Sequence, residues 1–500
     1  MTLRDLIPAL PRATVSGSLD PEIAALTASS REVAPGVLFA AIRGTSADGH
    51  KYISAAIEAG AIAILAETAP PADLTDKVTW LHVADSRRAI AALASAFYGH
   101  PWRDLAMAGI TGTNGKTTTA FLLHHVMKTV WHRSGLLGTV RVDDGLASAP
   151  ARHTTPGSIE LSALLSTMRG NGCRGVAMEV SSHGIHQDRV GGIGFDACVF
   201  TNLTQDHLDY HGTIDDYFAA KAAWFHNLAA DPMGKKPTAV INVDDSYGAE
   251  LAQALEGKMP VIRFGFGVHC DFRANSLRQS ARGMEFELTV KGKSYLVRAP
   301  LIGRFNVYNL LAALGAATAC GIRLREAIAA VATAPQVPGR MEFVGTAGGT
   351  NVFVDYAHTP DALENACRTL RELNPRRLLT VFGCGGDRDR TKRPLMAAAA
   401  SRHSDACIVT SDNPRSEDPL AIIREIEPGL TGKGNRSIPD RAEAIAYTIR
   451  NAFSGDIVLI AGKGHESTQQ FADVTIDFDD RKHASLALRE RAAAFTQPKR

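Results

Sequence analysis

The sequence contains no hydrophobic run long enough to cross a membrane. The longest apolar stretches, such as Ala89 to Tyr98, fall well short of the roughly 20 residues that a membrane-spanning helix needs. The N-terminal segment MTLRDLIPAL carries charges at Arg4 and Asp5 and lacks the apolar core of a secretory signal peptide. These absences predict a cytoplasmic protein without membrane insertion.

Cysteine is scarce, and its spacing excludes the sites that depend on it. The seven cysteines lie far apart, with Cys367 and Cys384 the closest pair, and no CxxC motif occurs. Neither a disulfide framework nor a cysteine zinc site is expected, and an odd number of cysteines suits a reducing compartment.

The sequence also lacks an excess of charge of one sign. The formal net charge of +2 speaks against a dedicated nucleic-acid binder, which usually carries a basic excess or stripe.

Three α/β segments follow one another along the 500 residues, which exceed what one hydrophobic core supports. Short apolar runs alternate with helix-like stretches, a pattern that favours parallel sheets with crossover helices. We expect an N-terminal domain over 1–100, a central domain over 101–335 and a C-terminal domain over 336–500, with a linker at APQVPGR (334–340). The stretch 246–292 is expected to be peripheral to the central domain. The strand candidates are GVLFAAI (36–42), AIAILAE (61–67), TWLHVA (79–84), AMAGI (106–110), GVAMEV (175–180), DACVF (196–200), TAVIN (238–242), NVFVD (351–355), LLTVFG (378–383), ACIVT (406–410) and DIVLIA (456–461).

The stretch GITGTNGKTTT (109–119) is typical of a phosphate-binding loop with a shifted glycine. The common loop places a glycine six residues before its lysine, but that position relative to Lys116 is occupied by Ile110. A strand-like run precedes the loop and a helix-like run follows it, so backbone N–H groups and a helix N-terminus can hold phosphate oxygens. Lys116 can then reach the terminal phosphates, and the Thr117 hydroxyl can ligate Mg²⁺. The alternative is an ordinary glycine-rich turn between a strand and a helix.

GTNGKTTT resembles the ATP loop of the Mur ligases, the ATP-dependent enzymes that add amino acids to the peptidoglycan precursor. Further stretches resemble this family in the family's order, from about residue 29 to residue 466. The resemblance implies an α/β protein of three domains: a small N-terminal UDP-binding α/β domain, a central P-loop ATPase-like domain with a parallel sheet, and a Rossmann-like C-terminal domain that binds the amino acid. The stretches are SSREVAPGVLFAA (29–41), TTPGSIEL (154–161), MEVSSHGI (178–185), TNLTQDHLDYHGT (201–213), YFAAKAAWF (217–225), GRFNVYN (303–309), VDYAHTPDALEN (354–365), GCGGDRDRTKRPLM (383–396), DNPRSEDP (412–419) and AGKGHE (461–466).

The implied reaction joins a carboxylate to an amine at the expense of ATP. A carboxylate is a poor electrophile, so ATP first converts it to an acyl phosphate, from which the amine displaces phosphate through a tetrahedral intermediate. The resemblance implies that the carboxylate belongs to UDP-N-acetylmuramoyl-L-alanyl-D-glutamate, the UDP-MurNAc-dipeptide, and the amine to meso-2,6-diaminopimelate. Such a ligase serves peptidoglycan synthesis, and through it cell wall biogenesis, cell shape and cell division. We expect a monomer that acts on small-molecule substrates and contacts neither nucleic acid nor membrane.

Bringing a carboxylate up to a triphosphate sets anion against anion, and cations must cancel that repulsion. By resemblance, Lys116 and two Mg²⁺ ions do so, with Thr117, Glu179 and His207 serving the metal ions. From the residues alone, Glu179 could equally be a structural contact and His207 a zinc or hydrogen-bonding residue. Lys221 would ordinarily be a solvated lysine on a helix face. The resemblance implies an N6-carboxylysine, a lysine carbamylated by CO₂, because a carbamate offers Mg²⁺ anionic oxygens where an ammonium repels it.

The resemblance also assigns the nucleotide contacts. Asn306 and Asn309 share one helical face by their spacing, although helix capping would explain this pair as well. The expected ATP-binding residues are Gly112, Thr113, Asn114, Gly115, Lys116, Thr117, Thr118, Asn306, Asn309, Arg340, Asp355 and His358.

The residues expected to hold the UDP-MurNAc-dipeptide supply directional hydrogen bonds, and Arg189 can pair with a substrate carboxylate. Position 153 holds histidine where the family often has asparagine. Helix capping is the alternative for Thr155 and Ser181. The expected residues are Ser30, Thr45, Ser46, Ala47, His153, Thr154, Thr155, Ser181, Gln187 and Arg189.

The motif DNPR (412–415) decides the expected amino acid. Diaminopimelate carries an ammonium and a carboxylate at its far end, whereas lysine carries only the ammonium, and a guanidinium can hold that carboxylate bidentately. The lysine-adding relatives characteristically lack arginine here. A surface turn is the alternative reading of this motif. The expected diaminopimelate-binding residues are Arg388, Asp412, Asn413, Pro414, Arg415, Gly462 and Glu466.

Other classes of protein share parts of this pattern. Folylpolyglutamate synthetases and cyanophycin-type ligases share the ATP loop, but the N-terminal segment and DNPR speak against both. A regulatory nucleotide switch would need the loop without the amino-acid pocket.

Overall fold

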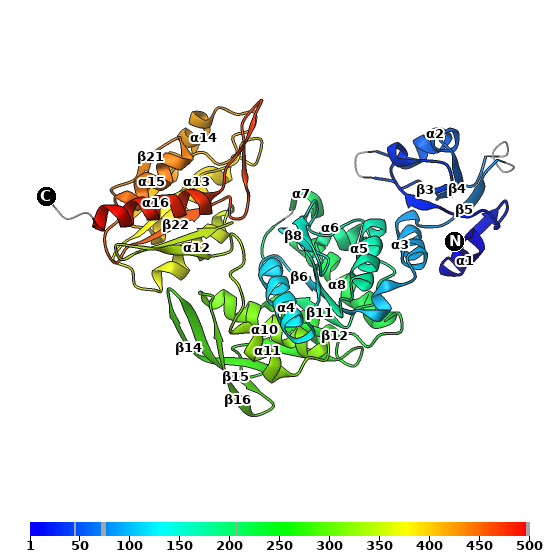
Figure 1. Ribbon diagram of the computed structural model, residues 1–500, viewed down its shortest axis with the longest axis horizontal. Helices are drawn as coiled ribbons and strands as arrows, with labels where there is room; N and C mark the ends of the chain where they lie inside the picture. Colours follow the sequence, from blue (N-terminus) through cyan, green and yellow to red (C-terminus); the bar gives the residue numbers. More distant parts are fainter. Residues whose placement is uncertain (45–46, 72–76, 207, 497–500) are drawn as a thin grey trace. The chain divides into compact units, whose positions relative to one another are not determined.

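The computed structural model describes residues 1–44, 47–71, 77–206 and 208–496 (Figure 1). The chain forms two compact units. Unit 1 comprises Met1–Arg273, Thr289–Gly292 and Tyr308–Ala330, and unit 2 comprises Ala274–Leu288, Lys293–Val307 and Val331–Arg500. None of the helices in these described ranges has both the length and the apolarity to span a membrane.

The first sheet of unit 1 has the strand order β1-β5-β4-β3-β2, in which β2 to β5 run parallel and β1 antiparallel. The side chain of Asp85 caps the helix α3 by accepting hydrogen bonds from two backbone N–H groups of its first turn. The buried face of α3, with Ile90 and Leu93, packs in one hydrophobic core with Leu38 and Leu65 of the strands. The three strands expected in this region are confirmed. The bounds are β1 Thr14–Ser16, β2 Ala25–Thr27, β3 Val37–Ala40, β4 Ala61–Ala66, β5 Thr79–His82, α1 Leu3–Leu6, α2 Ile53–Glu58 and α3 Ser86–Phe97.

The second sheet of unit 1 has a parallel core in the order β13-β12-β11-β6-β10-β7, followed by antiparallel β8 and β9. Its central strands are buried along almost their whole length, which is why they appear in the sequence as continuous apolar runs. The chain passes from β6 to β7 on one side and later from β10 to β11 on the other, so β6 lies where the strand order reverses. Open α/β sheets bind ligands at such a point, beyond the carboxyl ends of the strands. The bounds are β6 Ala106–Thr111, β7 Gly135–Leu137, β8 Arg141–Asp143, β9 Ser148–Pro150, β10 Gly175–Glu179, β11 Ala197–Phe200, β12 Thr238–Asn242, β13 Val261–Gly265, α4 Lys116–Trp131, α5 Ser158–Gly170, α6 Ser182–His186, α7 Leu208–His211, α8 Ile214–Ala230, α9 Ser246–Ala254, α10 Arg304–Ala319 and α11 Leu324–Val331.

The stretch 246–292, expected to be peripheral, contains α9 and then a run of strands that extends the second sheet. β13 pairs in parallel with β12, and β14 begins beside β13. Beyond it the strand order continues with β15 and β16 at the end of the sheet. The burial of β15 alternates between its two faces, as in a strand exposed on one side. The bounds are β14 Phe272–Ser280, β15 Gly283–Val290 and β16 Lys293–Ala299.

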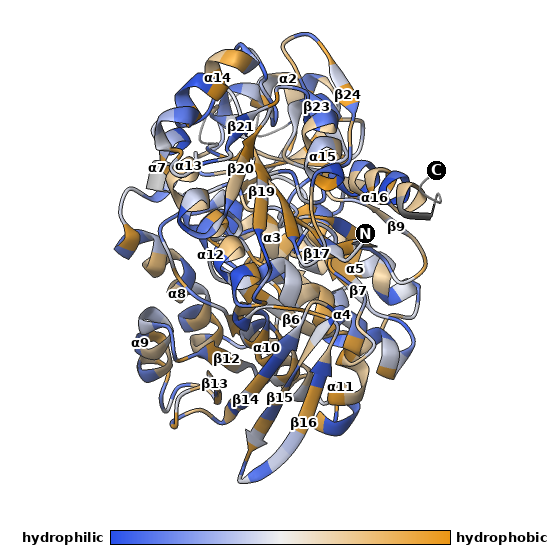
Figure 2. Cartoon of the chain, turned by 90° about the vertical axis from the view of Figure 1, so that its left-hand side faces the viewer, coloured by the Kyte–Doolittle hydropathy of each residue, from blue (hydrophilic) through white to orange (hydrophobic). Residues whose placement is uncertain are grey.

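Unit 2 is built around a six-stranded sheet of order β17-β18-β22-β19-β20-β21, parallel except for β17. Hydrophobic cores lie on both faces of this sheet, and β19 and β20 carry the hydrophobic colour in Figure 2. All four strands expected here are confirmed. The bounds are β17 Glu342–Ala347, β18 Thr350–Asp355, β19 Leu378–Phe382, β20 Ala406–Val409, β21 Arg436–Ser437, β22 Ile457–Ala461, the hairpin β23 Thr468–Gln470 and β24 Thr475–Asp477, and helices α12 Pro360–Arg371, α13 Lys392–His403, α14 Pro419–Ile426, α15 Arg441–Arg450 and α16 Asp480–Thr496.

Candidate active site

The expected phosphate-binding loop connects β6 to α4, so the strand–loop–helix order is confirmed. Gly112 and Gly115 adopt φ values of 138° and 87°, in the region that favours glycine. A Cβ atom at Gly112 would lie 2.0 Å from Thr201 Oγ1, and one at Gly115 would lie 2.3 Å from Asn309 Oδ1. Both glycines are therefore required by backbone conformation and by close neighbours.

Substituting alanine for Gly115 is expected to raise the Kd for ATP at least about tenfold. The left-handed backbone costs an L-residue roughly 1–2 kcal/mol, and the new methyl group would have to displace Asn309. Calorimetric titration with ATP measures the change. Gly170→Ala is the matched control, because a Cβ there meets nothing within 4 Å. Unchanged ATP affinity in Gly115→Ala would contradict a role of this loop in nucleotide binding.

The segment that follows β11 is hydrogen-bonded to the tip of the loop. Asn202 accepts a hydrogen bond from the backbone N–H of Asn114 through Oδ1 at 2.9 Å, and Thr201 Oγ1 donates to the carbonyl of Asn114 at 2.6 Å. Asn114 Nδ2 in turn donates to Thr204 Oγ1 at 3.2 Å. We did not assign Thr201, Asn202 or Thr204 from the sequence, although the motif TNLTQDHLDYHGT that contains them was recognised.

Two lysines converge on the carbonyl of Gly112. Lys116 Nζ donates to it at 2.9 Å, and Lys221 Nζ, from α8, donates to it at 3.1 Å. Lys221 is only 1% exposed, so the alternative of a solvated lysine is wrong. Burial, reinforced by the neighbouring Lys116, holds the pKa of Lys221 well below its ordinary value. The lowered pKa favours the neutral, nucleophilic form of this amine beside the expected phosphate-binding loop.

Oxygen atoms suited to Mg²⁺ lie next to the first turn of α4. Thr117 Oγ1 donates to Glu179 Oε2 at 3.1 Å, and the backbone N–H of Thr139 donates to Glu179 Oε1 at 2.8 Å. Glu179 is 1% exposed, at the end of β10 and paired in register with Ile110 of β6. One hydroxyl and one carboxylate beside a phosphate loop fit Mg²⁺, which usually completes its shell with phosphate oxygens and water. His207, the other expected metal residue, lies outside the described residues.

Five residues expected to hold the UDP-MurNAc-dipeptide form one hydrogen-bonded chain that begins at Glu179. Thr155 Oγ1 donates to the backbone carbonyl of Glu179 at 2.9 Å and lies 3.0 Å from Ser181 Oγ. Arg189 Nη1 donates to the carbonyl of Thr155 at 2.8 Å, and Arg189 Nη2 donates to Gln187 Oε1 at 2.8 Å. The chain is completed by Thr154, whose Oγ1 lies 3.0 Å from Thr139 Oγ1.

Helix capping, the alternative role for Thr155 and Ser181, is observed for Ser181 only. Ser181 is the N-cap of α6 and accepts from the N–H of Gly184, whereas the N-cap of α5 is Gly157 and not Thr155. His153 is exposed, Ser30 begins a short 3₁₀ turn, and the carbonyl of Ala47 accepts from the N–H of Gly44 at 2.8 Å. Thr45 and Ser46 lie outside the described residues.

The residues expected to contact adenine and ribose are placed by α10 and by the end of β18. Asn306 and Asn309 both lie within α10 and are buried, so neither caps its N-terminus at Arg304. Asp355 accepts backbone N–H bonds from Met341 and Ala357 at 2.6 and 2.9 Å. Burial raises the pKa of Asp355, although nearby Arg340 opposes that shift.

Two further residues of the expected nucleotide set lie beside Tyr356. The guanidinium of Arg340 lies 4.7 Å from the centre of the Tyr356 ring, and the exposed His358 lies with Nδ1 2.9 Å from the Tyr356 carbonyl. Tyr356 itself was not assigned from the sequence.

The residues of the expected amino-acid pocket meet at the carboxyl ends of β20 and β22. Arg415 adopts a φ of 53° and donates from Nη1 to the carbonyl of Gly386 at 2.6 Å. Asn413 Nδ2 donates to Glu466 Oε2 at 2.9 Å. Gly462 has a φ of 117°, and a Cβ atom at this position would lie 2.6 Å from Asp412 Oδ2. Glycine therefore leaves room for the Asp412 carboxylate. The guanidinium of Arg415, the amide of Asn413 and the carboxylates of Asp412 and Glu466 therefore all come from the segments that follow these two strands, as does Pro414 of the DNPR segment.

Arg388 and Arg415 flank the same loop. A Cβ built on Gly385 would lie 2.9 Å from Arg415 Nη1 and 3.9 Å from Arg388 Cγ. Arg393 lies fully buried beneath this loop, and its guanidinium pairs with Glu417 at 2.7 Å. Arg393 and Glu417 were not assigned from the sequence, although both belong to recognised motifs.

A fully buried ion pair fixes the strand ends that carry this pocket. Arg441 pairs with Asp480 at 2.7 Å and donates to the carbonyls of Ser411 and Ala461 at 3.3 and 3.0 Å. These carbonyls immediately precede Asp412 and Gly462. No sequence motif indicated this pair, because its partners lie 39 residues apart.

Comparison with known proteins matches three stretches to family descriptions. Residues 22–98 match the Mur ligase family catalytic domain, residues 110–317 the Mur ligase middle domain, and residues 339–464 the Mur ligase glutamate ligase domain. The chain is 46% identical over 497 residues to the UDP-N-acetylmuramoyl-L-alanyl-D-glutamate–2,6-diaminopimelate ligase of Geobacillus thermodenitrificans, covering 98% of this chain and 100% of the relative. It is 44% identical over 508 residues to the ligase of the same name from Geobacter metallireducens, covering 98% and 99%.

Solved structures agree with this likeness. A structure of a UDP-N-acetylmuramoyl-L-alanyl-D-glutamate–2,6-diaminopimelate ligase superimposes with a TM-score of 0.74 and 32% identity over 100% of both chains. A folylpolyglutamate synthase from Mycobacterium tuberculosis reaches a TM-score of 0.61 at 19% identity over 83% of this chain and 96% of that one, which is a likeness of fold alone.

Proposed function

The chain belongs to the Mur ligase family, and from this premise we propose that it joins meso-2,6-diaminopimelate to UDP-N-acetylmuramoyl-L-alanyl-D-glutamate at the expense of ATP. The observation that carries the choice of amino acid is the cluster of Arg415, Asn413 and Glu466, which offers a cation and an anion for a zwitterionic end group. The same assignment makes the protein a cytoplasmic, monomeric enzyme of peptidoglycan precursor synthesis.

The loop 112–118 binds the phosphates of ATP. Its backbone N–H groups and the N-terminus of α4 bind phosphate oxygens, and Lys116 supplies a positive charge beside them. Asn306, Asn309, Arg340, Asp355 and His358 hold the adenine and ribose in this proposal.

Thr117 and Glu179, with His207, would hold Mg²⁺, and the ion would supply the positive charge that lets the substrate carboxylate approach the triphosphate. The lowered pKa of Lys221 favours the neutral amine, which is the form that reacts with CO₂, and the resulting carbamate would give a second Mg²⁺ an anionic ligand in place of a repelling ammonium.

The remaining residues orient the two organic substrates. Ser30, Thr45, Ser46 and Ala47 bind the uridine diphosphate, and the chain from Thr155 to Arg189 aligns the dipeptide so that its free carboxylate faces the loop. The residues around Arg415 bind diaminopimelate, whose amine displaces phosphate from the acyl phosphate. Holding both reactants in place removes much of the entropic barrier of a bimolecular step.

Release of ADP, measured with each substrate omitted in turn, tests the proposed function. We expect ADP release to require both the UDP-MurNAc-dipeptide and meso-diaminopimelate, because the acyl phosphate forms only on the first and is consumed only by the second. ADP release that ignores the amino acid would instead indicate a nucleotide switch. ADP release that requires a folate in place of the UDP-MurNAc-dipeptide would indicate a folylpolyglutamate synthetase.

A further inference from the structure

The segment AGKGHE contains a charged residue to which the proposed function gives no role. Lys463 lies between Gly462 and Glu466, both expected to bind diaminopimelate, yet its side chain is 0% exposed. A lysine this deeply buried is rare unless it is paired. Lys463 Nζ donates to Asn413 Oδ1 at 2.9 Å and to Glu466 Oε2 at 3.1 Å. Both partners belong to the proposed amino-acid pocket.

Lys463 determines which way the amide of Asn413 points. An ammonium is a pure donor, so the end of the amide that faces Lys463 must be the oxygen. The same oxygen accepts the backbone N–H of Gln470 at 3.0 Å. The amide nitrogen is thereby turned toward Glu466, to which it donates at 2.9 Å. Without Lys463, the amide would lose one of the two donors that hold it in this orientation.

Lys463 also sets the position of the Glu466 carboxylate. Glu466 Oε2 receives donors from both Lys463 and Asn413. The Glu466 side chain is 32% exposed, whereas that of Lys463 is 0% exposed. The carboxylate is therefore held from its buried side while remaining accessible to a ligand, and Lys463 itself cannot reach one.

We propose that Lys463 is a positioning residue for the amino-acid substrate: it fixes the Asn413 amide and the Glu466 carboxylate, so that the carboxylate is placed to accept the ammonium at the far end of that substrate. This inference rests on the proposed function and deepens it. Because Lys463 acts on binding of one substrate alone, its loss should alter KM for that substrate with little change in kcat or in KM for ATP.

The variant Lys463→Met removes the charge while keeping an unbranched side chain. With ATP and the UDP-MurNAc-dipeptide saturating, we expect KM for meso-diaminopimelate to rise roughly 10- to 100-fold, the range for losing charged hydrogen bonds at a buried site. KM for ATP should stay within about threefold. Lys433→Met, at an exposed lysine of the same unit, is the matched control and should change neither constant. Should Lys463→Met fail to fold by circular dichroism, Lys463→Gln, which retains one donor group, should show a smaller rise in the same KM.

A double-mutant cycle separates positioning from general support of the fold. If Lys463 acts through Glu466, the rise in KM in Lys463→Met/Glu466→Gln should fall short of the product of the two single rises by at least about fivefold. Independent, multiplying effects would overturn the proposal, as would equal rises in KM for ATP and for the amino acid. An unchanged KM for the amino acid would overturn it too.

An assay of the wild-type protein, carried out first, distinguishes a failure of this inference from a failure of the proposed function. If the wild type uses an amino acid other than diaminopimelate, the proposed substrate fails, and KM for that other amino acid becomes the readout for Lys463. If the wild type uses diaminopimelate and Lys463→Met binds it equally well, only the role of Lys463 fails.

Discussion

Replacing Lys221 by alanine is expected to lower kcat at least about a hundredfold, the usual scale for removing one electrostatic contact from a transition state. Lys221 is buried beside Gly112 of the expected phosphate-binding loop, and this burial lowers the pKa of its amine, which favours the neutral form. Only the neutral amine can add to CO₂, so the burial that would make an ammonium costly also makes a carbamate accessible. Without the proposed carbamate, the Mg²⁺ that would offset the repulsion between the substrate carboxylate and the triphosphate would lack one of its ligands. ADP release under saturating substrates measures the loss.

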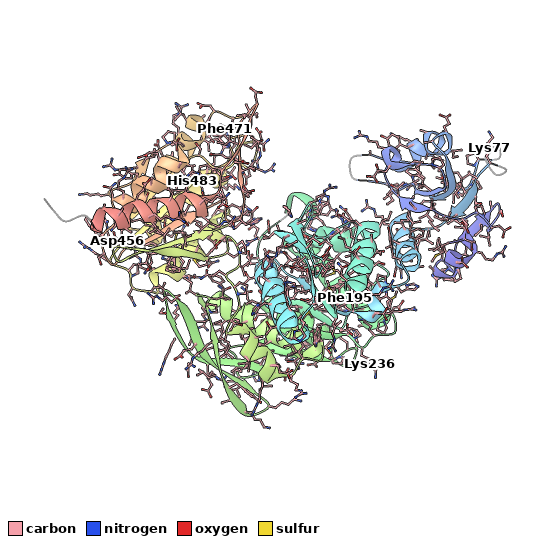
Figure 3. All side chains as sticks on the ribbon, in the orientation of Figure 1. Lys77, Phe195, Lys236, Asp456, Phe471 and His483 are labelled. Carbon is pink, nitrogen blue, oxygen red and sulfur yellow. The ribbon has the colours of Figure 1, made fainter. Side chains whose placement is uncertain are left out.

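A short carboxylic acid should partly restore the activity of Lys221→Ala, because formate or acetate can enter the space left by the side chain and supply the missing oxygens. Lys236→Ala is the matched control, because Lys236 is exposed on the same unit and is labelled in Figure 3. Neither this substitution nor the added acid should change the rate of ADP release in the control. Labelling with ¹³C-bicarbonate should give a carbamate signal in the wild type that is absent from Lys221→Ala. Full activity in Lys221→Ala would remove this residue from the mechanism.

Much of the fold could be predicted because its central strands are buried on both faces. β6, β10 and β22 appear in the sequence as continuous apolar runs bounded by turn residues, and each forms where expected. The strands toward the β16 end of the second sheet gave no such signal. β14, with the sequence FRANSLRQS, lies between β13 and β15 and carries polar residues throughout. Strands that are only partly buried are held by their neighbours, so their own sequence is a weak guide.

The candidate site was predictable where its residues follow one another and not where distant elements meet. The loop 112–117 and the DNPR motif are local patterns, and each lies at the carboxyl end of a strand as expected. The burial of Lys221 could not be predicted from AAKAAWF, because it depends on how α8 packs on the sheet. Trp224 of α8 packs edge-to-face on Phe195, labelled in Figure 3, at 5.1 Å between ring centres, and this face of the helix carries Lys221 inward. The sequence motifs therefore predicted the chemistry of the site, while the packing of helices supplied its electrostatics.

The wild-type protein should prefer meso-diaminopimelate over L-lysine by at least about tenfold in kcat/KM, and Arg415→Met should abolish most of that preference. Arg415 uses one guanidinium nitrogen to bind the Gly386 carbonyl, which leaves the rest of its fork for the far carboxylate of diaminopimelate. Lysine lacks this carboxylate, so its binding would leave the guanidinium desolvated and unpaired, at a cost of roughly 1–3 kcal/mol. In Arg415→Met the efficiency with diaminopimelate should fall by nearly the size of that preference, at least about tenfold, because a charged pair is lost, while the low efficiency with lysine should change little. Arg424→Met is the matched control, since Arg424 is a 68% exposed arginine of α14 whose pair with Asp418 is worth little. Equal efficiency of the wild type with both amino acids would refute diaminopimelate as the preferred substrate, and a preference that survives in Arg415→Met would assign the recognition of the carboxylate to another residue.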